Sequence, residues 1–120
     1  MKGDDISERL LDFGVRVLKA ADALPRRLGG KHIAMQLIRS GTAAGAVYEE
    51  ARGAESRADF VHKLGVSWKE VRESTYWLRL IRRSALIKPT RIIGLLQEAI
   101  DLSAILGKSV KTTKRGSSRD

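Results

Sequence analysis

The sequence contains no cysteine. Disulfide bonds, thiolate metal sites and a cysteine nucleophile are therefore excluded, which is consistent with a reducing cytoplasm. Long hydrophobic runs are missing as well, because charged residues interrupt every apolar stretch well short of the roughly 20 residues that a membrane span requires. The opening MKGDDISERLL meets acids before any apolar run and lacks the pattern of a signal peptide. We expect a soluble, cytoplasmic protein with no membrane partner.

Acidic residues are few relative to basic ones. The chain has 14 Asp and Glu against 23 Lys and Arg, which gives a formal net charge of +9. Such an excess attracts RNA, DNA or an acidic protein through electrostatic steering and counterion release. A basic protein without such a partner has the same composition, so charge alone leaves both interpretations open.

Strand-like alternation is also absent, whereas apolar residues recur at steps of three and four. In the first helical segment they are Ile6, Leu10, Phe13, Val17, Ala21 and Leu24. Two prolines and the glycine-bearing breaks divide the chain into four expected helices, at about 6–24, 31–52, 57–84 and 90–106. Since 120 residues suffice for one domain, we predict an all-α, antiparallel up-down four-helix bundle over residues 1–107.

Glycines and small residues raise two further expectations. The stretch SGTAAGA, residues 40–46, indicates close approach of a neighbouring helix, because a glycine inside a helix costs about 1 kcal/mol relative to alanine. Gly107 is placed to stop the fourth helix. The remaining KSVKTTKRGSSRD, residues 108–120, is basic and poor in apolar residues, so we expect a disordered tail.

The third helical segment has three distinct sides, since residues three and four apart share a side. The side that faces the core carries Phe60, Leu64, Val71, Thr75 and Leu78. A second side carries bases and a tyrosine but no acid: Lys69, Arg72, Tyr76, Arg79 and Arg83. A third side combines two carboxylates with apolar residues: Val66, Glu70, Glu73, Trp77 and Leu80.

Each of the two outer sides has two interpretations. The basic side either only solvates the helix or contacts phosphates, with Tyr76 placed to stack on a base. Trp77 either folds over the edge of its own core or anchors a contact with another subunit, where carboxylates can pair with arginines. We favour nucleic-acid contact for the second side and an oligomer interface for the third.

Residues that would support catalysis or metal binding are scarce. Neither His32 nor His62 follows a glutamate by three residues, the spacing of di-iron helical bundles. No HExxH, GxxxxGK[ST] or GxGxxG pattern occurs. Glu49 and Glu50 are adjacent and so point in different directions on a helix. We therefore expect no enzyme, no cofactor and no metal.

Two stretches carry a family resemblance: QLIRSGTAAGAVYEEARGAESRADFVHKL (residues 36–64) and WKEVRESTYWLRLI (residues 68–81). They resemble the small four-helix bundle family that includes the 23S rRNA-intervening-sequence proteins, over roughly residues 5–107. The chain is more distantly similar to the accessory variability protein of diversity-generating retroelements, which works alongside a reverse transcriptase and its RNA. The resemblance implies a homopentameric ring with a central channel, no catalysis, and nucleic-acid binding as the usual proposal.

The resemblance carries over motif positions as structural or interface positions only. They are Arg39, Ser40, Glu50, Phe60, Lys69, Glu70, Glu73 and Trp77. Two residues depart from the pattern, Val47 where many relatives have asparagine and Trp68 where many have a smaller aliphatic residue. The first removes a polar contact within the second helix, and the second fills more volume at the edge of the core.

The residues and the resemblance together predict a non-enzymatic, homo-oligomeric bundle that binds RNA or DNA through repeated basic helix faces, with a pentamer as the expected assembly. The alternative is a protein-interaction scaffold, or an accessory subunit of a mobile-element or reverse-transcriptase system, whose basic faces serve a protein partner.

Overall fold

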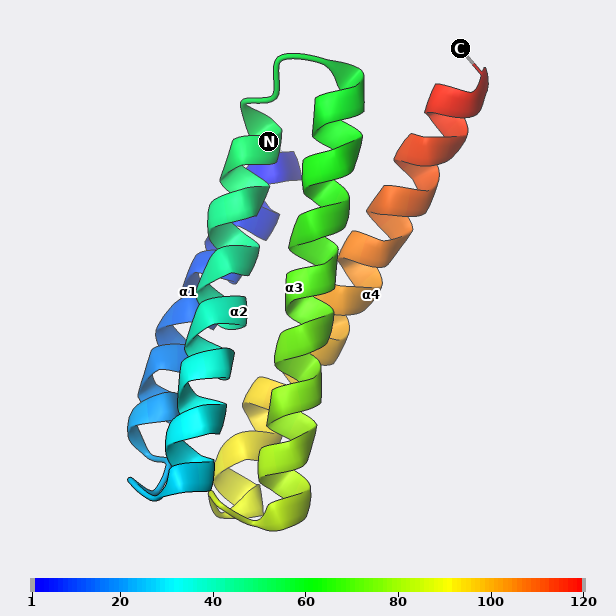
Figure 1. The fold of residues 1–120 in the computed structure, drawn as a ribbon. Helices are drawn as coiled ribbons and strands as arrows, with labels where there is room; N and C mark the ends of the chain where they lie inside the picture. The colour runs from blue at the N-terminus through cyan, green and yellow to red at the C-terminus, as the bar shows by residue number, and fades with distance from the viewer. Residues whose placement is uncertain (1, 120) are drawn as a thin grey trace.

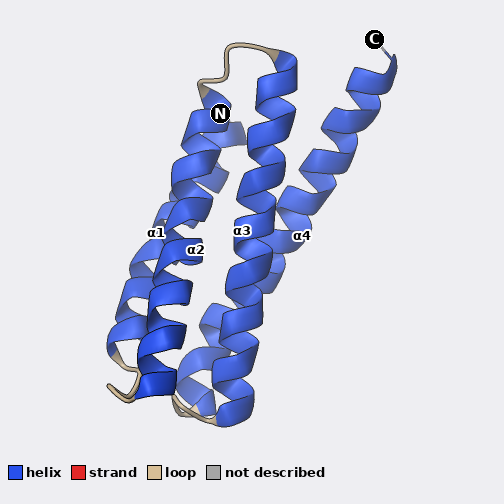
Figure 2. Cartoon of the chain, viewed as in Figure 1, coloured by secondary structure: helices blue, strands red, loops and turns tan. Residues whose placement is uncertain are grey.

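The computed structural model describes the backbone of residues 2–119 and the side chains of residues 3–116. It contains four α-helices, and no strand occurs within those residues (Figure 2). The helices are α1 (Lys2–Asp22), α2 (Leu28–Arg52), α3 (Arg57–Ser84) and α4 (Pro89–Arg119). Consecutive helices run in opposite directions and are joined by short turns (Figure 1). The prediction of an all-α four-helix bundle is confirmed for the single chain.

The ends of α3 lie where the sequence predicts them. Its N-cap Ser56 accepts a hydrogen bond of 3.0 Å from the backbone N–H of Asp59. It stops at Ala85, which has the left-handed backbone common at helix C-termini. Helices α1 and α2 begin earlier than predicted, at Lys2 and Leu28, and acids in the first turn of α1 complement the helix dipole there.

The buried stripe of α3 follows a seven-residue repeat: Leu64, Ser67, Val71, Ser74, Leu78 and Ile81. The two serines lie outside the predicted apolar pattern. Ser67 donates to the carbonyl of Ala44 at 2.7 Å, and Ser74 donates to the hydroxyl of Ser40 at 2.8 Å. Because serine is small and its hydroxyl is satisfied, α2 and α3 come close together without stranding a buried polar group.

Glycines bring α1 close to α2. A Cβ added at Gly41 would lie 2.7 Å from both methyl carbons of Val17, and one added at Gly45 would lie 3.4 Å from the Cβ of Leu10. Val17 is fully buried and its branched side chain has little rotamer freedom, so it cannot move aside easily. The prediction of close helix packing at SGTAAGA is confirmed.

The prediction that Gly107 stops the fourth helix is wrong, and so is the disordered tail over the described residues. α4 continues to Arg119 and diverges from the other helices toward its C-terminus (Figure 1), while residue 120 lies outside the described residues. Gly107 is buried under an indole ring, since an added Cβ would lie 3.0 Å from Nε1 of Trp68. Val110, 3% exposed, extends the core one turn further.

Helix α4 is the longest, with 31 residues. Even so, none of the helices in the described part of the chain has the length and apolar character needed to cross a membrane.

Alanine substitution at two helical glycines should have opposite effects on stability. We expect Gly41→Ala to destabilise the bundle, because overpacking against Val17 costs about 1–3 kcal/mol and exceeds the gain in helix propensity. Gly65→Ala, where an added Cβ meets nothing within 4 Å, should instead stabilise it by up to about 1 kcal/mol. Urea unfolding followed by circular dichroism measures both, and equal effects of the two substitutions would contradict the close packing at Gly41.

Candidate nucleic-acid interface

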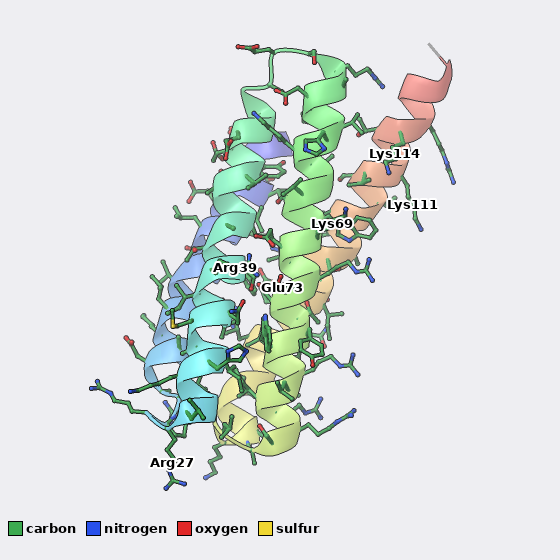
Figure 3. All side chains as sticks on the ribbon, in the orientation of Figure 1. Arg27, Arg39, Lys69, Glu73, Lys111 and Lys114 are labelled. Atoms are coloured by element: carbon green, nitrogen blue, oxygen red, sulfur yellow. The ribbon has the colours of Figure 1, made fainter. Side chains whose placement is uncertain are left out.

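The basic side of α3 is exposed along its whole length. It comprises Lys69, Arg72, Tyr76, Arg79 and Arg83, here called the basic stripe. Given a rise of about 1.5 Å per residue, the stripe covers about 20 Å of helix. Figure 3 shows Lys69 near the middle of α3. Tyr76 is 56% exposed, so its ring is open to a stacking partner. All five predicted residues therefore share one open surface.

The charges of the basic stripe have no acidic partners. Within the described residues, no ion pair or hydrogen bond engages the side chains of Lys69, Arg79 or Arg83. Several carboxylates elsewhere are paired with bases, as in the 2.6 Å ion pair of Arg9 with Glu98 between α1 and α4. Exposed positive charge without a counterion is the feature that phosphate groups recognise.

Arg72 is positioned by Trp68. Its guanidinium carbon lies 5.2 Å from the centroid of the indole ring, within the range of a cation–π contact. The same ring system lies against Gly107 of α4, where an added Cβ would be 3.0 Å from its Nε1. The larger residue at position 68, a departure from the family pattern, therefore links the basic stripe to the packing of α3 on α4.

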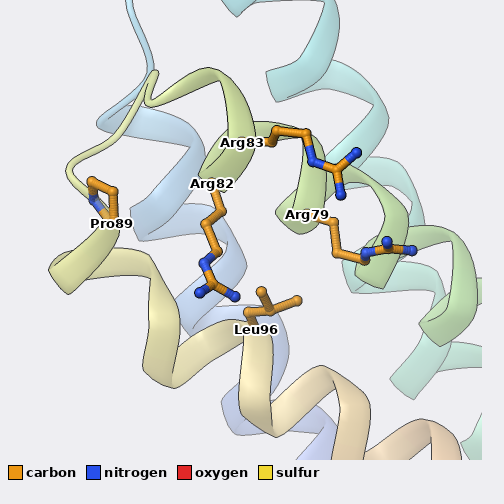
Figure 4. A pocket seen from close by; sticks show the side chains of 5 residues that line it. All are labelled: Arg79, Arg82, Arg83, Pro89 and Leu96. Carbon is orange, nitrogen blue, oxygen red and sulfur yellow. The ribbon is translucent and has the colours of Figure 1, made fainter.

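At its C-terminal end the stripe borders a cavity of about 540 Å³ between α3 and α4. The cavity is lined by Arg79, Arg82, Arg83, Pro89 and Leu96 and is here called the arginine pocket (Figure 4). Arg82 is not part of the predicted basic side. The sequence pattern gives little indication that Arg82 belongs to a site, because its place in the pocket depends on where α4 begins after the turn.

The third side of α3 faces α2 of the same chain. Arg39 on α2 forms an ion pair of 3.2 Å with Glu70 and a second ion pair with Glu73, and Figure 3 shows Arg39 and Glu73 side by side. The indole Nε1 of Trp77 donates to Glu73 at 3.0 Å. The edge of Trp77 also meets the ring of His32, with centroids 5.8 Å apart. Arginine–carboxylate pairing thus occurs here within one chain.

The residues of this side are all half-buried, and Trp77 and Leu80 pack against the core. Val66 has the same intermediate exposure. Within one chain, Trp77 therefore folds over the edge of its own core, which was one of the two interpretations. The oligomer interface through this side stays a prediction.

Two of the other motif positions join α2 to α3. Arg39 forms the ion pairs described above, and Ser40 is the buried partner of Ser74. Glu50 is exposed and lies 3.9 Å from the Nζ of Lys63. Phe60 is half-buried and packs against the core. Arg39, Ser40 and Phe60 thus contribute to packing within the chain, whereas Glu50 lies at its surface.

A second surface feature was absent from the predictions, a groove between α1 and α2. Leu11, Val15 and Leu18 on α1 expose between 45% and 61% of their surface along it. Gly14, Gly45 and Ala46 also line this groove of about 540 Å³, here called the apolar groove. The sequence indicates this groove only through the number of apolar residues in α1, which is larger than its core-facing side requires.

The described residues contain no group of three His, Cys, Asp or Glu side chains placed to hold a metal ion. His32 contacts Trp77 through its ring, and His62 is exposed.

Two opposing influences act on the carboxyl of Glu73. Burial raises its pKa, but hydrogen bonds from Trp77 and Arg39 and the positive charge of Arg39 together lower it below the usual 4.5. The folded protein therefore holds this proton less tightly than the unfolded chain does. The resulting stabilisation is present above the usual pKa and is lost as the pH falls through the lower, folded-state value.

We expect Glu73→Gln to reduce the loss of stability on acidification. Between pH 6 and pH 3 the free energy of unfolding should fall less in this variant than in the unmodified protein, because the titrating group is gone. Glu55→Gln removes an exposed carboxylate with no ion pair among the described residues and serves as the control. Urea unfolding at each pH measures the difference, and identical pH profiles for Glu73→Gln and the unmodified protein would contradict the assignment.

Comparisons with known proteins identify the family and support the fold. The family model of the 23S rRNA-intervening sequence protein matches residues 4–108. A solved structure, from Bacteroides thetaiotaomicron VPI-5482, is described as a protein with unknown function from the S23 ribosomal protein family. It is 32% identical in sequence, superimposes with a TM-score of 0.83, and the match covers 92% of this chain and 99% of that one. No curated protein matches the chain.

The family match spans all four helices, from the first turn of α1 to the turn of α4 that contains Gly107. It includes both the basic stripe and the Arg39–Glu73 contact. The solved structure has the same fold over nearly its whole length. The chain belongs to the 23S rRNA-intervening sequence protein family.

Proposed function

We propose that this protein is a cytoplasmic, non-enzymatic nucleic-acid-binding protein that acts as a homo-oligomer. The observation that carries the proposal is the basic stripe: four exposed cations with no acidic partner among the described residues, and an exposed tyrosine, on one side of α3. The family name refers to an intervening sequence of 23S rRNA, which supports RNA as the polyanion. The absence of cysteine supports the cytoplasmic assignment.

The chemistry of the stripe favours backbone contact over base reading. Lys69, Arg72, Arg79 and Arg83 would engage phosphates, and phosphate contacts fix position without reading sequence. Tyr76 would stack on an unpaired base, which is sequence-tolerant because every base has a π-face. Binding should therefore be strongly salt-dependent and only weakly sequence-selective.

The apolar groove supports self-association. Exposed leucines beside a concave surface mark sites where a partner excludes water, and we assign this site to a second copy of the chain. The groove lies between α1 and α2, whereas the basic stripe borders α4 (Figure 1). A neighbouring copy in the groove would leave the stripe free, and a ring would repeat the stripe in every subunit. The pentamer implied by the family resemblance is the assembly we propose.

Removing charge from the stripe should weaken RNA binding and make the affinity less dependent on salt concentration. For Arg72→Gln, Arg79→Gln and Arg83→Gln combined, the slope of log affinity against log salt for single-stranded RNA should become shallower by about 2, since each lost phosphate contact contributes about 0.7. Fluorescence anisotropy between 50 and 200 mM salt measures this slope.

The matched control for that experiment is Lys108→Gln, Lys111→Gln and Arg115→Gln, which removes the same charge from the C-terminal turns of α4. It should keep most of the unmodified slope. Absence of RNA binding at 50 mM salt, or equal losses in both triple variants, would refute the assignment to the stripe.

Disrupting the apolar groove should dissociate the assembly. We expect light scattering to return a mass of about five times 13.3 kDa for the unmodified protein. Leu11→Glu with Leu18→Glu should return a monomer of unchanged helicity, because buried charge in a subunit contact is strongly unfavourable. Leu28→Glu, at an exposed leucine away from the groove, is the control.

Trp77→Ala distinguishes the two candidate interfaces. If α3 forms the contact, this substitution should dissociate the assembly while the Leu11 and Leu18 variant remains associated. If the groove forms it, Trp77→Ala should only lower the stability of each subunit. A monomer of 13.3 kDa for the unmodified protein would refute self-association altogether.

A further inference from the structure

The arginine pocket is concave and is larger than two other cavities that basic side chains line, of about 190 Å³ and about 210 Å³. Its volume of about 540 Å³ lies within the roughly 300–1,000 Å³ typical of small-ligand sites. Leu96 and Pro89 of α4 supply apolar lining, and the three cationic side chains come from the last turns of α3. Figure 4 shows Arg82 reaching toward Leu96 and Arg79 and Arg83 extending to one side. The backbone of a nucleic-acid duplex can lie on a convex protein surface and does not need a concave one. The concave shape of this pocket therefore indicates a smaller chemical group as its ligand.

The electrostatics of the pocket favour a multiply charged anion. No carboxylate is among its lining residues, and within the described part of the chain Arg79, Arg82 and Arg83 have no ion pair. Three neighbouring cations repel one another, and an anion between them relieves that repulsion. The first turn of α4, which begins at Pro89, also lacks an acid, so its positive dipole end is not neutralised.

A smaller cavity of about 190 Å³ adjoins the pocket. It is lined by Tyr76, Arg79, Leu80 and Arg83, so two arginines line both cavities. Tyr76 presents an exposed ring there, held edge-on against Trp77 with ring centroids 5.0 Å apart. A cavity rich in arginine beside one that also carries an aromatic and an aliphatic side chain matches the two parts of a nucleotide, the phosphate and the base.

We propose that the arginine pocket binds the terminal phosphate of a single-stranded nucleic acid, with the terminal base on Tyr76 and Leu80. A terminal phosphate carries more negative charge than an internal phosphodiester and exposes three oxygens, which suits several guanidinium groups at once. This assignment rests on the proposed function, since it takes RNA as the ligand, and adds a preference for a chain end that the open stripe does not supply.

The test compares three single-stranded RNAs of one sequence with an internal fluorophore: one with a 5′-phosphate, one with a 3′-phosphate and one with hydroxyls at both ends. The unmodified protein should bind one of the phosphorylated RNAs about tenfold more tightly than the hydroxyl RNA, as expected for charge-assisted hydrogen bonds. The phosphorylated RNA that shows the gain identifies the recognised end.

Arg82→Gln is the informative variant, because Arg82 lines the pocket but lies outside the basic stripe. It should bring the affinity ratio of phosphorylated to hydroxyl RNA close to one while changing binding of hydroxyl RNA by less than about twofold. Arg91→Gln removes the same charge from the first turn of α4, in a cavity lined with Arg16 and Lys19, and should keep the ratio. Circular dichroism verifies that both variants remain helical.

The outcomes separate this proposal from the general one. Equal affinity of the unmodified protein for all three RNAs would overturn the terminal-phosphate site while leaving RNA binding intact. An equal fall of the ratio in Arg82→Gln and Arg91→Gln would overturn it as well, because the effect would then be one of overall charge. No binding of any of the RNAs would overturn both proposals.

Discussion

The close approach of α2 and α3 is the constraint on which the rest of the structure depends. Along this contact the buried residues Ser40, Ser67 and Ser74 are smaller than the apolar residues that usually fill a core. Their hydroxyl groups are hydrogen-bonded inside the core. At that separation Arg39 reaches carboxylates on two successive turns of α3, and Trp77 lies across the seam. With α2 and α4 covering its other sides, α3 has one side left for solvent, and that side is the basic stripe.

The net charge is distributed unevenly because many of the acids pair with bases away from the turn between α3 and α4. Carboxylates on all four helices pair with arginines and lysines, either between helices, as Glu98 does with Arg9, or within one helix, as Asp59 does with Lys63 in α3. The turn between α3 and α4 receives none of these acids. Uncompensated charge therefore accumulates around Arg79, Arg82 and Arg83, and the chain obtains a localised electropositive surface from a modest excess of bases.

Much of this fold can be predicted from apolar spacing, because helix faces and caps are local properties. The buried Leu64, Val71 and Leu78 of α3 follow from the spacing, whereas the buried serines between them do not. The end of α4 does not, since Gly107 has the residue type of a helix stop and only its neighbour Trp68 shows that it serves close packing. The pairing of Glu73 with Arg39 and the position of Arg82 in the pocket likewise depend on contacts between helices. The spacing of residues along one helix does not predict such contacts.

The indole of Trp68 contacts two residues that differ in every other respect, Gly107 in the interior of α4 and Arg72 on the outer surface of α3. A substitution at either position alters the packing around the shared ring. We therefore expect the effects of substituting both positions to differ from the sum of the single effects. A buried glycine thereby takes part in setting the direction of a surface guanidinium, which ties the interior packing of this bundle to the chemistry of its exterior.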